Sequence, residues 1–118
     1  MSDTTIMRAL MDVIEERKTR EPGERSYVVS LLRGGVAKIG GKIVEEAAEV
    51  VEAGDEPGDD GREHLVKEVA DLVFHAMVLL GYRDARWEDV EFELARRFGI
   101  SGIVEKESRS QKSPGPKG

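Results

Sequence analysis

The sequence predicts an all-α protein, a small bundle of four or five helices. Apolar residues recur every three or four positions over 4–18 and 87–98, which is the spacing of a helix that buries one face. The segment 26–32 is too short to assign by periodicity, but no partner strand for it is evident elsewhere in the chain. Aromatic residues make up only 5% of the chain, which also fits a helical protein.

Turn signals divide the chain between these periodic segments. A Pro-Gly pair interrupts 19–25, and an acidic stretch with Gly and Pro fills 54–61. Ser26 can cap a short helix that ends at a Gly-Gly pair, and the next helix begins near Val36 or near Lys42. We therefore expect helices over 4–18, 26–35, 36–53, 62–81 and 87–98.

The length of 118 residues is the commonest one for a single domain. We expect one all-helical domain over 1–109. The last residues, 110–118, are polar and rich in Pro and Gly, so we expect them to form a disordered tail.

The composition excludes several classes of function. The net charge of −6 argues against a nucleic-acid partner, and the absence of cysteine excludes disulfides and thiolate sites. The chain has neither a run of 18 apolar residues nor a signal sequence, so we expect a cytoplasmic protein without membrane contact. A chain this acidic must meet any polyphosphate substrate with a metal ion and local cations.

Two predicted helices carry acids at helical spacing, one on each side of the loop 54–61. On the first, Glu45, Glu46 and Glu49 share an arc of about 100°. On the second, Glu68 and Asp71 lie one turn apart. This second helix is apolar almost all round, which is typical of a buried helix.

One narrow stripe interrupts that apolar surface. It holds His64, Glu68, Asp71 and His75, and it contains no Lys or Arg. Buried carboxylates are costly unless they are paired or bind a cation. If the acids of the first helix meet this stripe, they raise one another's pKa, and a hard divalent cation, Mg²⁺ or Mn²⁺, relieves the repulsion. The two motifs together favour a metal site.

Two other interpretations stay open. The acids can form a solvated face of a non-catalytic helical module, because Glu-x-x-Glu is common in helices. A di-iron carboxylate bundle uses a Glu-x-x-His pair on each of two helices. This chain has Asp71 and His75 four residues apart and no Glu-x-x-His, which counts against iron.

Two lysines fall on the acidic face of the first helix if that helix begins early. Lys38 and Lys42 can then form ion pairs with the acids, or they can receive an anionic substrate beside the metal. The sequence favours neither role over the other.

Four segments together resemble the phosphoribosyl-ATP pyrophosphohydrolases, within the MazG-like all-α nucleotide pyrophosphohydrolases. The resemblance runs from about Arg8 to Arg97. It rests on SYVVSLL at 26–32, EEAAEVV at 45–51, EVADLVFHAMVLL at 68–80 and WEDV with ELARR within 87–97. The chain departs from the family pattern at Val28, where Thr is usual, and keeps all five acids.

The resemblance implies hydrolysis of phosphoribosyl-ATP to phosphoribosyl-AMP and pyrophosphate, the second step of histidine biosynthesis, with Mg²⁺. It further implies that Glu46, Glu49, Glu68 and Asp71 ligate the metal. Glu45, the second candidate catalytic acid beside Glu46, would act as general base or as a hydrogen-bond acceptor behind the ligands. Lys38, Lys42, Arg25, Arg33 and Arg97 would hold phosphates, and His75 would hydrogen-bond a ligand carboxylate or the substrate. The acid motif alone also fits a housekeeping pyrophosphohydrolase for dUTP or dCTP. A homodimer would complete so small a bundle.

Overall fold

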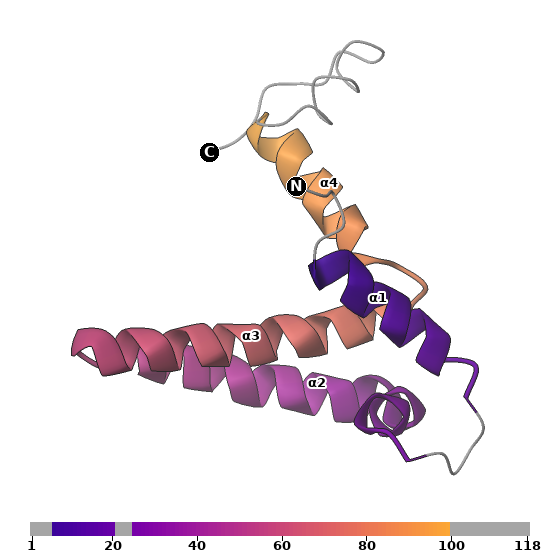
Figure 1. Ribbon diagram of the computed structural model, residues 1–118, viewed down its shortest axis with the longest axis horizontal. Coiled ribbons are helices and arrows are strands. Elements are labelled where there is room, and N and C mark those ends of the chain that lie inside the picture. Colours follow the sequence, from indigo (N-terminus) through magenta and orange to yellow (C-terminus); the bar gives the residue numbers. More distant parts are fainter. Residues whose placement is uncertain (1–5, 21–24, 100–118) are drawn as a thin grey trace. The chain divides into compact units, whose positions relative to one another are not determined.

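The computed structural model describes residues 6–20 and 25–99, which form four helices and no strand (Figure 1). The helices are α1 (Ile6–Arg17), α2 (Tyr27–Gly54), α3 (Gly58–Tyr82) and α4 (Trp87–Phe98). The predicted all-α fold is therefore confirmed, and α4 has the predicted bounds. The tail predicted over 110–118 lies outside the described residues. None of the helices described is long and apolar enough to cross a bilayer.

The chain forms two compact units, Met1–Ala85 and Arg86–Gly118. The first contains α1, α2 and α3, and the second contains α4. In the second unit, the backbone N–H of Arg86 donates to Asp89 Oδ2 at 2.9 Å, and Gly99 ends the helix in a left-handed conformation. These are ordinary helix-end interactions, which explains why the bounds of α4 are readable from the sequence.

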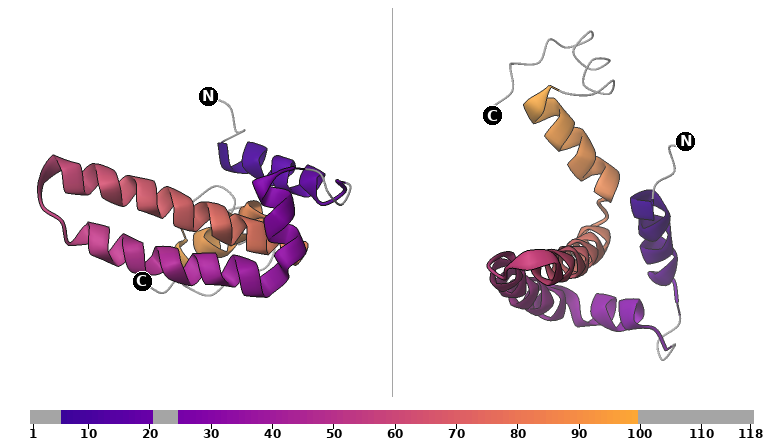
Figure 2. Two further views of the ribbon diagram at one scale, coloured as in Figure 1. Left: turned by 90° about the horizontal axis from the view of Figure 1, so that it is seen from below. Right: turned by 60° about the vertical axis from the view of Figure 1, so that its left-hand side comes forward.

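The first unit is built on an antiparallel hairpin of α2 and α3, whose helices lie side by side in every view (Figures 1 and 2). Only 55–57 separates the two helices, because α3 begins at Gly58 and not near residue 62. The early start places Asp59 and Asp60 in the first turn, where negative charge is favourable. The prediction of an acidic loop over 54–61 is therefore wrong in its length.

The Gly-Gly pair bends a helix where the sequence predicted an end. Gly35 has φ 69° and ψ −161°, a conformation that is essentially restricted to glycine, and α2 continues on both sides of it (Figure 2). Ser26 caps the first half as predicted, accepting a hydrogen bond from Val29 N at 3.3 Å. Tyr82 closes the bend, because a β-carbon at Gly35 would lie 3.2 Å from its hydroxyl.

The core of this unit lies where α1 crosses α2 and α3. Its largest fully buried side chains are Met11 and Ile14 from α1, Leu31 and Ile39 from α2, and Met77 and Val78 from α3. Gly81 allows the close approach of α1, because a β-carbon there would lie 2.7 Å from Ile14 Cγ2. The core thus holds the base of the hairpin.

The rest of the hairpin is less covered than its sequence predicts. Val44 and Val51 on α2 are 72% and 73% exposed, and Val66 on α3 is 63% exposed. The expectation that α3 is buried almost all round is therefore wrong for the single chain. Beside these exposed valines, Glu46 of α2 is only 7% exposed.

Candidate active site

Glu46 is the buried carboxylate of the hairpin, and α2 directs it toward α3. Its Oε1 atom lies 2.6 Å from Nδ1 of His75, a residue that is itself only 4% exposed. A carboxylate with so little water needs a partner of this kind, because an unpaired buried charge is costly. In the structure, His75 therefore hydrogen-bonds one of the predicted acids.

A second contact extends this pair to Tyr27, at the start of α2. Nδ1 of His75 faces two acceptors, Glu46 Oε1 and the carbonyl oxygen of Asp71 at 3.0 Å, so we assign the ring proton to Nδ1. Nε2 then accepts, and the hydroxyl of Tyr27 donates to it at 2.8 Å. Phe74 packs its ring edge against His75, with centroids 4.8 Å apart. The result is a directed chain of hydrogen bonds, Tyr27 to His75 to Glu46.

Glu49 and Glu68 meet across the hairpin without a cation between them. The pKa of Glu49 is raised, first by its hydrogen bond to Glu68 and by the charge of Glu68, and further by the charges of Glu45 and Glu46. Two carboxylates can share a hydrogen bond only if one of them holds a proton. The structure therefore brings four of the five predicted acids into electrostatic range of one another.

Glu68 is satisfied on one oxygen only. Its Oε2 lies 3.0 Å from Nε2 of His64, whereas its Oε1 is buried and has no hydrogen-bond partner while Glu49 is ionised. Nδ1 of His64 lies 3.0 Å from Glu56 Oε1, and the hydrogen bond to Glu56, followed by that to Glu68, raises the pKa of His64. The unpartnered Oε1 is the one buried carboxylate oxygen in the described part of the chain that has a vacant hydrogen-bonding position.

Asp71 stands apart from the other four acids. Its side chain is exposed, and it enters the network through its backbone carbonyl. Across residues 6–20 and 25–99, no three His, Asp or Glu side chains are already arranged around a metal position. The arrangement is a set of close carboxylates that has to adjust to hold a cation.

The predicted phosphate-binding cations are distributed over both units. Lys42 Nζ lies 3.2 Å from Glu45 Oε1, and Lys38 Nζ donates to Ser30 Oγ at 3.3 Å. Arg33 lines a separate pocket, Arg25 is exposed, and Arg97 of the second unit pairs with Glu93 at 2.8 Å. Of the two roles left open for the lysines, Lys42 thus fills the role of an ion-pair partner in the single chain.

Tyr27 is the site residue that the sequence analysis did not identify. The sequence predicts only that Tyr27 lies in a short capped helix. Its hydrogen-bond partner, His75, lies 48 positions away. The register of the hairpin brings the two together, and no local spacing indicates that register.

Known proteins match nearly the whole chain. The family model described as phosphoribosyl-ATP pyrophosphohydrolase matches residues 7–98. A phosphoribosyl-ATP pyrophosphatase of Geobacter metallireducens is 51% identical over 104 residues, 88% of this chain and 92% of that protein. The same enzyme of Geotalea daltonii is 50% identical over 106 residues, 90% and 96% of the two chains. That of Rhodopirellula baltica is 48% identical over 103 residues, 87% and 85%.

The family match over residues 7–98 covers nearly all of the four helices. The resemblance seen in the sequence is confirmed. The chain belongs to the phosphoribosyl-ATP pyrophosphohydrolase family.

Proposed function

We propose that this chain hydrolyses phosphoribosyl-ATP to phosphoribosyl-AMP and pyrophosphate, in histidine biosynthesis, and that the reaction depends on Mg²⁺, which Mn²⁺ can replace. Family membership supports the reaction. The observation that supports the metal is the contact of Glu49 with Glu68 beside the buried Glu46. We expect the enzyme in the cytoplasm, which cell fractionation tests.

The acids fit a hard divalent cation by their chemistry. All the donors are carboxylate oxygens, which Mg²⁺ and Mn²⁺ prefer. Glu68 Oε1 is buried and lacks a partner, and the raised pKa of Glu49 reports a repulsion that a cation would remove. We assign Glu46, Glu49, Glu68 and Asp71 as the ligands, with Asp71 turning from its exposed position to join them.

The residues around these ligands would then have separate tasks. Bound Mg²⁺ would neutralise phosphate oxygens and lower the pKa of a coordinated water molecule. His75 and Tyr27 hold Glu46 in place through their hydrogen bonds. Glu45, exposed and adjacent to Glu46 in the sequence, would accept the proton of the attacking water, while the bond from phosphorus to the pyrophosphate oxygen breaks.

The cations near α2 would hold the phosphates. Lys42 already lies beside Glu45, and Lys38 is exposed one turn earlier. We keep Arg25 and Arg97 as weaker candidates, because Arg25 is exposed and Arg97 pairs with Glu93 in the second unit. A lysine that gives up its ion pair for a phosphate loses little, since an exposed pair is worth about 0–1 kcal/mol.

We also propose a homodimer. Val44, Val51, Val66 and Val69 leave much of the hairpin apolar and exposed, and a second copy of this chain offers the same surface to cover it. Analytical ultracentrifugation tests the dimer, and a Val51→Lys variant should be monomeric if these valines form the interface.

A product assay tests the reaction. Pyrophosphate release should be fast with phosphoribosyl-ATP and Mg²⁺, and it should cease with excess EDTA. Equal or faster release from dUTP or dCTP would show a housekeeping pyrophosphohydrolase instead. Full activity in EDTA would exclude the metal.

A further inference from the structure

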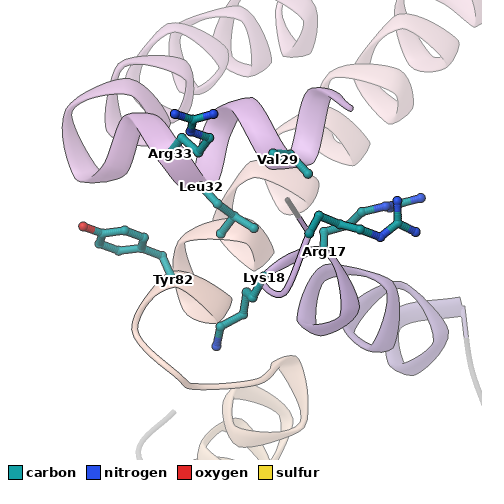
Figure 3. A pocket seen from close by; sticks show the side chains of 7 residues that line it. Arg17, Lys18, Val29, Leu32, Arg33 and Tyr82 are labelled. Carbon is teal, nitrogen blue, oxygen red and sulfur yellow. The ribbon is translucent and has the colours of Figure 1, made fainter. Parts of the chain in front are cut away.

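A second site lies at the base of the hairpin, where the end of α1, the first turns of α2 and the end of α3 surround a pocket of about 320 Å³ (Figure 3). Its lining is Arg17, Lys18, Arg20, Val29, Leu32, Arg33 and Tyr82. Four of these seven residues are cations, in a chain whose net charge is −6. We call this site the basic pocket.

Two of the four cations are matched by carboxylates of the same chain. Lys18 Nζ lies 2.7 Å from Asp84 Oδ1 and 3.3 Å from Glu15 Oε1. Arg20 Nε donates to Glu16 Oε2 at 2.6 Å, and its Nη2 donates to Glu16 Oε1 at 3.1 Å. These pairs neutralise Lys18 and Arg20, and they give the pocket a fixed wall.

Arg17 is matched more weakly, and Arg33 is not matched in this way. The Nε of Arg17 is buried and has no hydrogen-bond partner, and its ion pair is a long one, 3.6 Å to Glu16 Oε1, an oxygen that also accepts from Arg20. Arg33 comes from α2, is exposed, and forms no ion pair within the described ranges 6–20 and 25–99. Two guanidinium groups from different helices therefore have donors to spare at one pocket.

The floor between these cations is apolar. Val29 is buried, and Figure 3 shows Leu32 in the middle of the lining with Arg17, Lys18 and Arg33 around it. Tyr82 forms part of the wall, and its hydroxyl lies close to Gly35, 3.2 Å from where a β-carbon of that residue would be. An apolar floor with charged donors at the rim suits a small ligand that has a compact carbon body and an anionic group. Arginine recognises phosphate through two parallel hydrogen bonds.

We propose that the basic pocket binds a sugar phosphate, with Arg17 and Arg33 on the phosphate and the sugar over Leu32. None of the five acids lines the pocket, and Arg33 lies 13 positions before Glu46 along α2, so the pocket is distinct from the acids. The sugar phosphate is either a free metabolite or the phosphoribosyl end of the substrate.

The second source rests on the proposed function and extends it. ATP and phosphoribosyl-ATP have the same triphosphate, so acids and metal at that triphosphate cannot distinguish them. A phosphate site away from the acids can, because only phosphoribosyl-ATP carries a second phosphorylated ribose. The basic pocket would then determine which adenine nucleotide the enzyme accepts.

Ribose 5-phosphate is the probe for binding, and Arg17→Gln and Arg33→Gln are the variants. Arg33 is exposed, so its substitution leaves the core intact. Arg62→Gln is the matched control, because Arg62 is an exposed arginine of the same unit that pairs with Asp59 at 3.2 Å, away from the pocket. Isothermal titration should detect ribose 5-phosphate binding to the wild type and to Arg62→Gln, and a loss of about tenfold or more in each pocket variant.

Steady-state kinetics separate the two sources. If the substrate supplies the phosphate, ribose 5-phosphate competes with phosphoribosyl-ATP, and the pocket variants raise KM for phosphoribosyl-ATP about tenfold with a much smaller change in kcat and none in KM for ATP. If a free metabolite supplies the phosphate, ribose 5-phosphate does not compete with phosphoribosyl-ATP, and the pocket variants still lose ribose 5-phosphate binding. Equal affinity for ribose 5-phosphate in wild type and variants, or no binding together with unchanged KM values, overturns the proposal. A wild type that binds ribose 5-phosphate but never cleaves phosphoribosyl-ATP would overturn the proposed function alone.

Discussion

The acids in the middle of the α2–α3 hairpin and the cations at its base are arranged in opposite ways. In the middle, Glu49 meets Glu68, and the charges of Glu45 and Glu46 add to the repulsion. At the base, Lys18 and Arg20 lie within 3.3 Å of carboxylates. Charges of one sign are thus concentrated in the first region and largely cancelled in the second.

The difference indicates how many charges in each region are unpaired and can bind a ligand. Exposed ion pairs such as those of the basic pocket contribute little to the free energy of unfolding, and they leave two arginines with unused donors. Among the described residues, Lys42 and His64 lie beside the acids, and they are too few to match all of them, so ionising all of the acids costs stability unless a cation binds. Unmatched charge, and not the number of charged residues, distinguishes a binding site from a solvated face.

If the acids behave as ordinary surface charges, the contrast between the acids and the basic pocket does not hold. The substitution Glu49→Gln is the strongest test of this. The substitution keeps the shape and removes a proposed ligand, so activity should fall by orders of magnitude. The metal-free protein should keep or gain stability, because the repulsion from Glu68 is relieved. Pyrophosphate release and thermal unfolding without metal measure the two effects.

Glu52→Gln is the control for that test. Glu52 is exposed on the same helix and belongs to neither acid motif, so its substitution should change neither activity nor stability. Near-normal pyrophosphate release from both variants would mean that this face of α2 holds no metal.

The next largest effect is expected for the chain of hydrogen bonds from Tyr27 through His75 to Glu46. Tyr27→Phe removes the hydroxyl and keeps the ring that stacks on Phe74, so Glu46 loses only its indirect support. Removing such a supporting hydrogen bond lowers metal affinity about 10–100-fold. Mn²⁺ binding measured by electron paramagnetic resonance should show this loss while the fold is retained.

A double-mutant cycle with His75→Gln decides whether the three residues act as one unit. If they do, the double variant should bind Mn²⁺ about as well as His75→Gln alone. Additive losses would mean that Tyr27 supports the metal site by another route.

Metal affinity should rise with pH. The pKa of Glu49 is raised, so a bound proton competes with the cation until the pH passes that pKa. Calorimetric titration of Mg²⁺ should give tighter binding at pH 8 than at pH 5.5. The same affinity at both values would show that the acids are well separated in solution.

The smallest effect is the pH dependence of metal-free stability. The pKa of His64 is raised above its ordinary value of 6.5, so its contribution is complete below that value and is lost as the pH rises through the raised pKa. Chemical unfolding without metal should therefore give a free energy that decreases above pH 6.5. His64→Gln should remove that decrease, and a slope unchanged by this substitution would contradict the pairing with Glu56 and Glu68.

The sequence was sufficient for the all-α fold and for the bounds of α4, because both depend on local spacing, but it divided α2 and began α3 too late. The bounds of α4 and the cap at Ser26 follow from residues within one turn of each helix end. The partner of Glu46 lies 29 positions away and that of Tyr27 lies 48 away, and such contacts depend on the register of the hairpin. Periodicity also marks which residues are apolar without saying what covers them, so the exposure of Val51 was not predictable from one chain.

The bend at Gly35 has a consequence for how this protein can vary by mutation. Every missense change in the codon of Gly35 adds a β-carbon, because glycine is the only residue without one. At φ 69° and ψ −161° each of those side chains is strained, and each would press on the hydroxyl of Tyr82. No substitution at this position is mild. The direction that α2 takes after the bend is therefore kept only as long as residue 35 remains glycine.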